Sequence, residues 1–283
     1  GVLKVLEEEG IGVDLMVGTS AGALIGGAYA SGQSPKEIQD KIDAYLQSPE
    51  FDESRIKAIG LSLSREEKSI LKKAQQYVIN RLLFVQAFYK PAILPTHDFQ
   101  WLIHYFLPDM DIGQTRIPFY VVATDLITGK KIVYSEGPLR KLVLASCSVP
   151  GAVEPVRYGD RLLADGGITS LVPVQAAREV GADVVIAVEV DRDMQTNVPI
   201  ETAKDIIFRA GEITAGALSS AELAAADVVI RPQVGSLHWM DFNRATTLVQ
   251  AGEDATRESL ANIEASLPLF RRMTRLTGRL FRK

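Results

Sequence analysis

The feature that most constrains this fold is a serine flanked by glycines at residues 18–22, which read Gly-Thr-Ser-Ala-Gly. An apolar run at 13–17 precedes them, and a run of small residues at 21–30 follows. A strand and a helix joined by a sharp turn, with serine at its apex, form the context of a nucleophile elbow. Glycine tolerates the backbone angles of such a turn, and small neighbours let the strand and helix pass closely. Because Ser20 would begin a helix, where free N–H groups favour negative charge, the pattern predicts a nucleophile.

The same residues allow a second interpretation. A glycine-rich turn between strand and helix often contains a serine whose side chain only caps the helix. The position of Ser20 in the motif is therefore not enough to infer a reaction. A residue elsewhere in the chain must also serve as its base.

Apolar runs rich in β-branched residues recur along the chain and alternate with helical patterns. They lie at 118–124, 131–134, 183–190 and 227–231. Strands this apolar are typical of a sheet buried on both faces, which is usually parallel and covered by helices. We predict an α/β fold with three layers, α/β/α, around a mainly parallel sheet, in one domain over residues 1–268.

The alternation stops between about residues 52 and 112, where the pattern is helical and amphipathic. Apolar residues recur there at helical spacing: Ile70, Leu71, Ala74, Val78, Leu82 and Val85. We predict a helical insertion. It is either a lid over an active site or an extra helical layer packed on the core.

Composition excludes several kinds of site. The chain has 283 residues, of which 47% are apolar, and no window approaches 18 uncharged apolar residues, so we expect no membrane-spanning helix. Three histidines and one cysteine do not cluster, so we expect no metal site. The single cysteine, Cys147, cannot form an internal disulfide and suits a reducing compartment, so we expect a cytoplasmic protein. No basic residue flanks Cys147, and we interpret it as a small core residue.

A serine nucleophile needs a base, and two residues are candidates. Asp165 follows an apolar run at 161–164 and precedes Gly166 and Gly167, which clear space around it. An aspartate at a strand end can face a nucleophile at the same edge of a sheet, although Asp-Gly is also an ordinary turn. His238 would complete the chain order Ser…Asp…His of α/β-hydrolases. Only 19 residues precede Ser20, too few for the strands that precede the nucleophile in those folds, so Asp165 is favoured.

Residues 18–22 taken together with Asp165-Gly166-Gly167 resemble the patatin-like phospholipases, including neuropathy-target-esterase-like serine hydrolases. Their bacterial members carry Gly-Thr-Ser-Ala-Gly early and Asp-Gly-Gly or Asp-Gly-Ala later. Further blocks resemble the family's first helix, its middle strand and turn, and the segment ahead of its aspartate: residues 1–8, 123–129 and 145–150. We interpret Asp125, in the middle block, as structural, because an aspartate before a turn usually binds backbone N–H groups.

The resemblance implies a Ser–Asp dyad without histidine, metal or cofactor. Ser20 would attack an ester carbonyl and Asp165 would accept its proton, with Thr19, Ala21 and Gly22 completing the elbow. A carboxylate near pKa 4 is a weak base for an alcohol, so stabilisation of the oxyanion must lower the barrier as well. The family builds that site from the elbow, here the Ala21 N–H, and from a glycine-rich loop, which with the first strand would precede Gly1.

The last 15 residues, 269–283, carry six basic side chains and no acidic one. At helical spacing their leucines and methionine fall on one face and their arginines on the other. Such a basic amphipathic helix suits an anionic membrane surface, so we expect peripheral membrane contact. The alternatives are a disordered tail or a segment packed on a partner subunit. The remainder of the chain is acidic, which argues against a nucleic-acid partner.

We therefore expect a hydrolase of phospholipids or lysophospholipids. The alternatives are a histidine-dependent serine esterase or acyltransferase, and a non-catalytic lipid-binding scaffold with the same fold. The oligomeric state has no signature in these residues.

Overall fold

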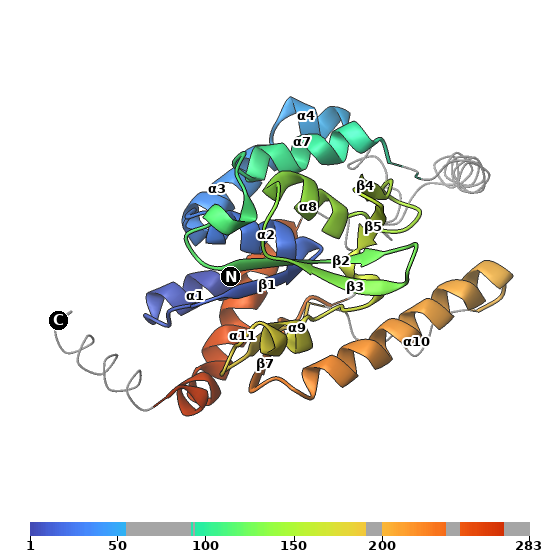
Figure 1. Cartoon of the computed structure of the whole chain (residues 1–283). Helices are drawn as coiled ribbons and strands as arrows, with labels where there is room; N and C mark the ends of the chain where they lie inside the picture. The colour runs from blue at the N-terminus through green and yellow to red at the C-terminus, as the bar shows by residue number, and fades with distance from the viewer. Residues whose placement is uncertain (55–91, 93, 191–199, 236–243, 269–283) are drawn as a thin grey trace. The chain divides into compact units, whose positions relative to one another are not determined.

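A computed structural model describes residues 1–54, 92, 94–190, 200–235 and 244–268. Contacts group the chain into two compact units (Figure 1). The larger comprises Met16–Leu171 with Ser236–Ala245, and the smaller comprises Gly1–Leu15, Val172–Gly235 and Thr246–Lys283. Each has its own sheet and its own apolar core.

The sheet of the larger unit carries the candidate site at the end of its first strand. Strands β1 (Met16–Thr19), β2 (Phe119–Asp125), β5 (Arg161–Asp165) and β4 (Val156–Tyr158) follow one another across it, and β3 (Lys130–Tyr134) also pairs with β2. Thr19 pairs with Val122, and Asp165 pairs with Ala123, the next residue of β2. Strand β2 therefore brings the ends of β1 and β5 to the same place.

Strand direction differs from the mainly parallel sheet that we expected. In this sheet β1 and β2 are parallel, whereas β2 with β3, β2 with β5 and β4 with β5 are antiparallel. The apolar pattern did not reveal strand direction, because β2 and most of β5 are as buried as parallel strands usually are, although the two pair antiparallel. The α/β class is confirmed, and the helical content with a mixed sheet is consistent with a three-layer α/β/α fold.

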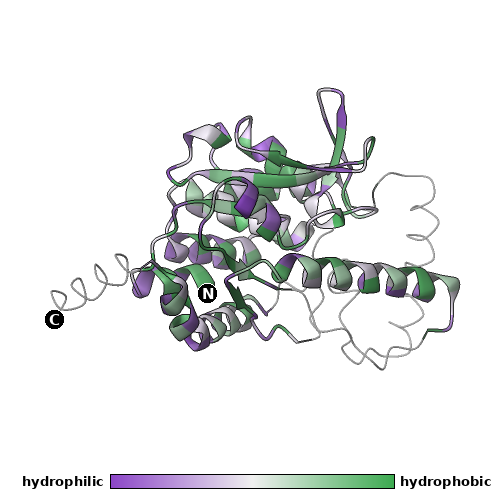
Figure 2. Cartoon of the chain, turned by 60° about the horizontal axis from the view of Figure 1, so that its bottom comes forward, coloured by the Kyte–Doolittle hydropathy of each residue, from purple (hydrophilic) through white to green (hydrophobic). Residues whose placement is uncertain are grey.

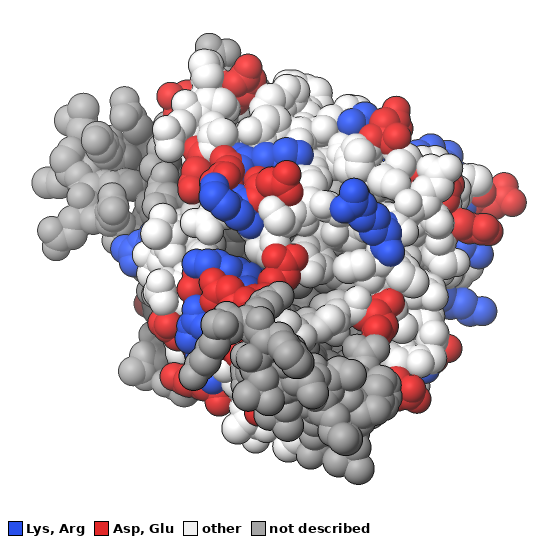
Figure 3. All heavy atoms as spheres, turned by 90° about the vertical axis from the view of Figure 1, so that its left-hand side faces the viewer, with Lys and Arg blue, Asp and Glu red and all other residues white. Residues whose placement is uncertain are grey.

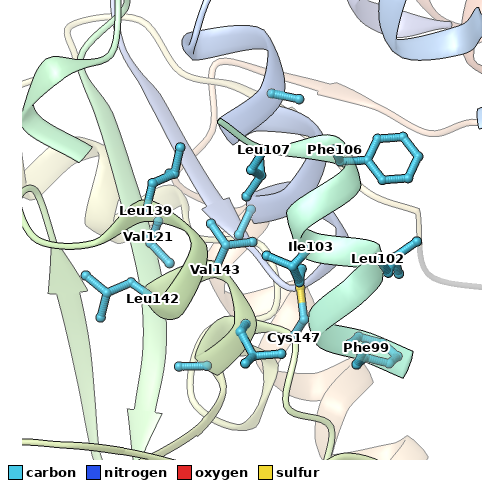
Figure 4. Packing of buried hydrophobic residues seen from close by; sticks show 14 of the residues in the cluster. Phe99, Leu102, Ile103, Phe106, Leu107, Val121, Leu139, Leu142, Val143 and Cys147 are labelled. Carbon is cyan, nitrogen blue, oxygen red and sulfur yellow. The ribbon is translucent and has the colours of Figure 1, made fainter. Parts of the chain in front are cut away.

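Helices of the larger unit pack on its sheet and on one another. They are α2 (Ala21–Ala30), α3 (Pro35–Leu46), α4 (Pro49–Glu53), α7 (Thr96–Phe106) and α8 (Leu139–Ser146), with short 3-10 turns η1 (Ile112–Gln114) and η2 (Gly166–Ile168). Figure 4 shows α7 and α8 sharing one buried cluster, to which they contribute Phe99, Leu102, Ile103, Phe106, Leu139, Leu142 and Val143. Full burial of each such side chain contributes about 1.5–3 kcal/mol, so α8 is firmly held.

The smaller unit has a two-stranded parallel sheet and four helices among its described residues. These are α1 (Val2–Glu8), α9 (Val174–Glu179), β6 (Ile186–Val188), α10 (Ala203–Leu223), β7 (Val228–Ile230) and α11 (Ala245–Ser266). Its core joins Leu6 and Ile11 to Ile230 and Ile263. Helix α10 shows both hydrophobic and hydrophilic stretches along its length (Figure 2), and its Ile206, Ile207 and Ile213 are exposed.

Ion pairs join α1 to α11. Lys4 Nζ lies 2.6 Å from Glu253 Oε1, and Arg257 Nη2 lies 2.8 Å from Glu8 Oε2. On the face drawn in Figure 3, positive and negative side chains are interspersed among uncharged ones.

Parts of three predictions lie outside the described residues. These parts are most of the 52–112 insertion, His238, and the 269–283 tail. At the ends of the insertion α4 and α7 are helical, and the apolar face of α7 is buried in the core. The choice between lid and layer, and the single domain over 1–268, stay predictions. Within the described ranges, no helix has the length and apolar character needed to cross a membrane.

Candidate active site

Ser20 is the single residue between β1 and α2, and its backbone is strained. Its φ is 53° and its ψ is −123°, and no other non-glycine residue in the described part of the chain has a positive φ. Such a conformation costs on the order of 1–3 kcal/mol and persists only where its surroundings hold it. At Gly18 a Cβ would lie 2.6 Å from Ala23 Cα, so β1 and α2 approach too closely for a side chain there.

The start of α2 faces solvent. The Ser20 carbonyl accepts the N–H groups of Ala23 and Leu24 at 2.8 and 3.1 Å, so the N–H groups of Ala21 and Gly22 precede the first intrahelical bonds. Both residues are exposed. Ser20 makes no side-chain cap to the helix, contrary to the interpretation of this turn as a cap. Gly22 has open space around its Cα, so close packing explains Gly18 but not Gly22.

The Ser20 side chain turns instead to Asp165, the last residue of β5. Ser20 Oγ donates a hydrogen bond of 2.7 Å to Asp165 Oδ2, and the Gly167 N–H donates one of 2.7 Å to Oδ1. Asp165 is only 6% exposed. Burial raises the pKa of its carboxyl to about 6, against the opposing effect of the hydrogen bonds from Ser20 and Gly167. The sequence-predicted pair is therefore adjacent in space.

Two glycines after Asp165 let η2 lie against β2. A Cβ at Gly166 would come within 2.4 Å of the Val122 carbonyl oxygen, and one at Gly167 within 3.0 Å of Asp165 Oδ1. Beyond η2, the Thr19 hydroxyl donates to the Ser170 carbonyl at 3.0 Å. This bond joins the elbow to the aspartate turn at a second point besides the Ser20–Asp165 hydrogen bond.

Sequence reasoning missed the contacts of Ser146 and its two successors at the end of α8. Ser146 Oγ accepts the Ser20 N–H at 2.9 Å and donates to the Val122 carbonyl at 2.6 Å. Cys147 Sγ donates to the Ser20 carbonyl at 3.2 Å, and the Ser148 carbonyl accepts the Asp165 N–H at 2.9 Å. The only signal was that residues 145–150 formed a family-like block, to which we assigned no role.

Cys147 is buried, as the sequence predicted for a core residue. Burial, and secondly the charge of Asp165, raise the pKa of its thiol well above the ordinary value. The sulfur therefore stays protonated near neutral pH and acts as a donor to Ser20.

Asp125 accepts hydrogen bonds from backbone N–H groups, as expected. Desolvation opposes its charge, yet hydrogen bonds from the Thr128 hydroxyl and from the N–H groups of Ile127 and Leu162, with Arg161 nearby, hold the pKa of Asp125 below its ordinary value. Among the described residues, no three His, Cys, Asp or Glu side chains gather as they would around a metal ion.

Comparison with known proteins gives a consistent family. The family described as "Patatin-like phospholipase" matches residues 1–178. An uncharacterized NTE family protein of Mycobacterium tuberculosis (strain H37Rv) is 29% identical over 208 residues, which cover 71% of this chain and 49% of that protein. Patatin-like phospholipase domain-containing protein 6 of Homo sapiens is 29% identical over 202 residues, 70% of this chain and 13% of that protein.

A second uncharacterized NTE family protein of M. tuberculosis (strain CDC 1551) matches more of the chain. It is 24% identical over 293 residues, covering 92% of this chain and 43% of that protein. The chain thus spans about half, or less, of the length of these relatives.

Proposed function

The chain belongs to the patatin-like phospholipase family, and from that premise we propose that it is a serine hydrolase of fatty acyl esters. Its substrates would be phospholipids or lysophospholipids. The observation that carries the proposal is the 2.7 Å hydrogen bond from Ser20 Oγ to Asp165 Oδ2 at the apex of a strained elbow. Nucleophile and base within hydrogen-bond reach, with the base held by a third group, is the arrangement that covalent catalysis needs.

In the proposed reaction Ser20 Oγ attacks the ester carbonyl carbon while its proton passes to Asp165 Oδ2. The tetrahedral intermediate collapses as Asp165 returns the proton to the departing alcohol or lysolipid, leaving the fatty acyl group on Ser20. Water then attacks this acyl-enzyme and gives a proton to Asp165. As the bond between the acyl carbon and Ser20 Oγ breaks, Asp165 returns that proton to Oγ, which releases the fatty acid and restores the Ser20 hydroxyl. A pKa of about 6 makes Asp165 a stronger base than an ordinary aspartate while it remains ionised at neutral pH.

The negative charge on the carbonyl oxygen needs donors that are already in place. The exposed N-terminus of α2 offers the Ala21 N–H, reinforced by the helix dipole. The Ser20 N–H is already taken by Ser146 Oγ. We propose that the second part of the oxyanion site is the glycine-rich loop that the family resemblance places upstream of Gly1.

The family description and the printed names of the relatives, several of which read phospholipase, support a lipid substrate. We propose that the basic amphipathic segment 269–283 brings the protein to anionic membrane surfaces as a peripheral contact. Among the alternatives, the histidine-dependent esterase requires His238, and the lipid-binding scaffold requires no reaction at Ser20.

A fluorophosphonate probe, which reacts with activated serines, tests the proposal. Labelling and release of fatty acid from lysophosphatidylcholine should both require Ser20 and Asp165, and both should survive His238→Ala. Ser20→Ala and Asp165→Asn are the informative variants, and labelling should increase when the upstream glycine-rich loop is present. Loss of labelling in His238→Ala would favour the histidine-dependent enzyme. A folded protein with the upstream loop that stays unlabelled would leave the scaffold as the better account.

A further inference from the structure

We propose that Ser146 is a positioning residue for the nucleophile, acting through the backbone of Ser20. It belongs to a three-residue segment, residues 146–148, that holds the main chain of both Ser20 and Asp165. The kinetic part of this inference rests on the proposed function, whereas the structural part does not.

Ser146 uses its hydroxyl in both directions. A serine hydroxyl has one proton to donate and lone pairs to accept, and here the proton points to the Val122 carbonyl at 2.6 Å while Oγ accepts the Ser20 N–H at 2.9 Å. Ser146 is fully buried. Because Val122 of β2 pairs with Thr19 of β1, the hydroxyl ties the turn that bears the nucleophile to the strand beside it.

The two residues after Ser146 extend the same restraint. Cys147 Sγ contacts the Ser20 carbonyl, so the peptide groups on both sides of the Ser20 Cα are held from α8. The Ser148 carbonyl accepts the Asp165 N–H, so the base is held from the next position along the same chain segment. One short segment therefore sets the distance between the two ends of the Ser20–Asp165 hydrogen bond.

The segment is rigid enough for this task. The Cys147 N–H donates to the Val143 carbonyl at 3.0 Å, and the Ser148 N–H donates to the Ala145 carbonyl at 3.1 Å. Cys147 and α8 belong to the same buried cluster as Ile103 of α7 (Figure 4). Motion at the end of α8 would therefore require disturbance of the packed core.

The strained conformation of Ser20 is what makes such a restraint matter. A residue with φ of 53° relaxes toward an ordinary conformation unless its neighbours prevent it. Relaxation would swing Oγ away from Asp165, and misplacement by about 1 Å can lower a rate by about a hundredfold. Substrate binding by the rest of the site would be little affected.

Ser146→Ala and Ser148→Ala make a matched pair for the test. Both remove a fully buried serine hydroxyl of the segment 146–148 that donates to a backbone carbonyl, that of Val122 for Ser146 and that of Leu144 for Ser148. Only Ser146 Oγ contacts Ser20. We expect Ser146→Ala to lower kcat by about ten- to a hundredfold with KM within about twofold of the parent value. Ser148→Ala keeps the backbone carbonyl that accepts the Asp165 N–H and loses only the hydroxyl. It should therefore stay within about threefold of the parent in both constants while losing a similar amount of thermal stability.

Hydrogen exchange at the Ser20 amide gives a second readout that needs no activity. Exchange should become at least tenfold faster in Ser146→Ala and stay near the parent rate in Ser148→Ala. If the Ser20 amide exchanges faster in Ser146→Ala but the two variants have equal kcat, the catalytic part of the proposal is overturned. Unchanged exchange in Ser146→Ala would overturn the restraint itself. If the parent protein hydrolyses no ester, the proposed function fails, and exchange alone still decides whether Ser146 restrains the elbow.

Discussion

The hydroxyl of Ser20 lies 2.7 Å from Oδ2 of Asp165, although 145 positions separate the two residues in the chain. The other carboxylate oxygen accepts the Gly167 N–H, so the hydrogen bond to Ser20 forms with an oxygen of fixed orientation. The two side chains form a direct donor–acceptor pair, and several of their measurable properties follow from the burial of the carboxyl.

The pH dependence of hydrolysis should report Asp165. Only the ionised carboxylate accepts the Ser20 proton, and burial raises its pKa to about 6. We expect kcat/KM to rise about tenfold per pH unit below about pH 6 and to level off above it, because this constant reports groups of the free enzyme. His238→Ala should leave the midpoint in place. A midpoint near 4, or one that moves in the histidine variant, would contradict this assignment.

Asp165→Asn should abolish hydrolysis and yet stabilise the fold at pH 8. In the folded state the pKa of Asp165, about 6, lies above the ordinary value of 3.8. The ionised carboxylate therefore destabilises the fold at any pH above about 6. This destabilisation disappears as the pH falls below about 4, where Asp165 is protonated in both the folded and the unfolded state. Removal of the charge should raise the free energy of unfolding at pH 8 by roughly 1–3 kcal/mol. Chemical denaturation of the parent and of Asp165→Asn at pH 8 and pH 4 measures the difference between their free energies of unfolding at each pH. A variant less stable than the parent at pH 8 would show that the charge is better compensated than its burial indicates.

Asp125→Asn should have the opposite effect on stability. Hydrogen bonds hold the pKa of Asp125 below its ordinary value, so its ionised form stabilises the fold above about pH 4 and that contribution is lost as the pH falls through the folded pKa. We expect a Tm lower than that of the parent at pH 8, a smaller difference near pH 3, and hydrolysis within about twofold of the parent. Scanning calorimetry at the two pH values checks this, and a large loss of activity would instead give Asp125 a role in the reaction.

The sequence was informative where a local pattern carries the structure. The elbow at Ser20, the strand end at Asp165 and the extents of β2 and β3 depend on glycine, β-branched residues and spacing, which a single sequence displays. Strand direction is not local, because a buried antiparallel strand such as β5 has the same apolar composition as a parallel one. The contacts of Ser146 were equally invisible, because its partner Ser20 lies 126 positions away and a buried serine has no distinctive neighbours in sequence.

Gly22 shows a different kind of limit. Its position in the motif predicted the same need for a small residue as at Gly18. A Cβ added at Gly22 would have no neighbour within 4 Å, whereas one added at Gly18 would collide with the backbone of α2. A motif records which residue type is present without distinguishing a packing requirement from another cause.

The two glycines of the elbow should therefore respond differently to alanine. A Cβ at residue 18 would lie 2.6 Å from backbone atoms of Gly22 and Ala23, so β1 and α2 would have to separate, and we expect Gly18→Ala to lower Tm by roughly 5–10 °C or to prevent folding. Gly22→Ala meets nothing within 4 Å and lies in a helix, where alanine is favoured over glycine by about 0.5–1 kcal/mol. Its Tm should equal or exceed that of the parent. Calorimetry of both variants at pH 8 measures the difference, and Ser20 labelling reports whether the elbow survives. Equal destabilisation by the two alanines would mean that the close approach of β1 and α2 is not what requires glycine at residue 18.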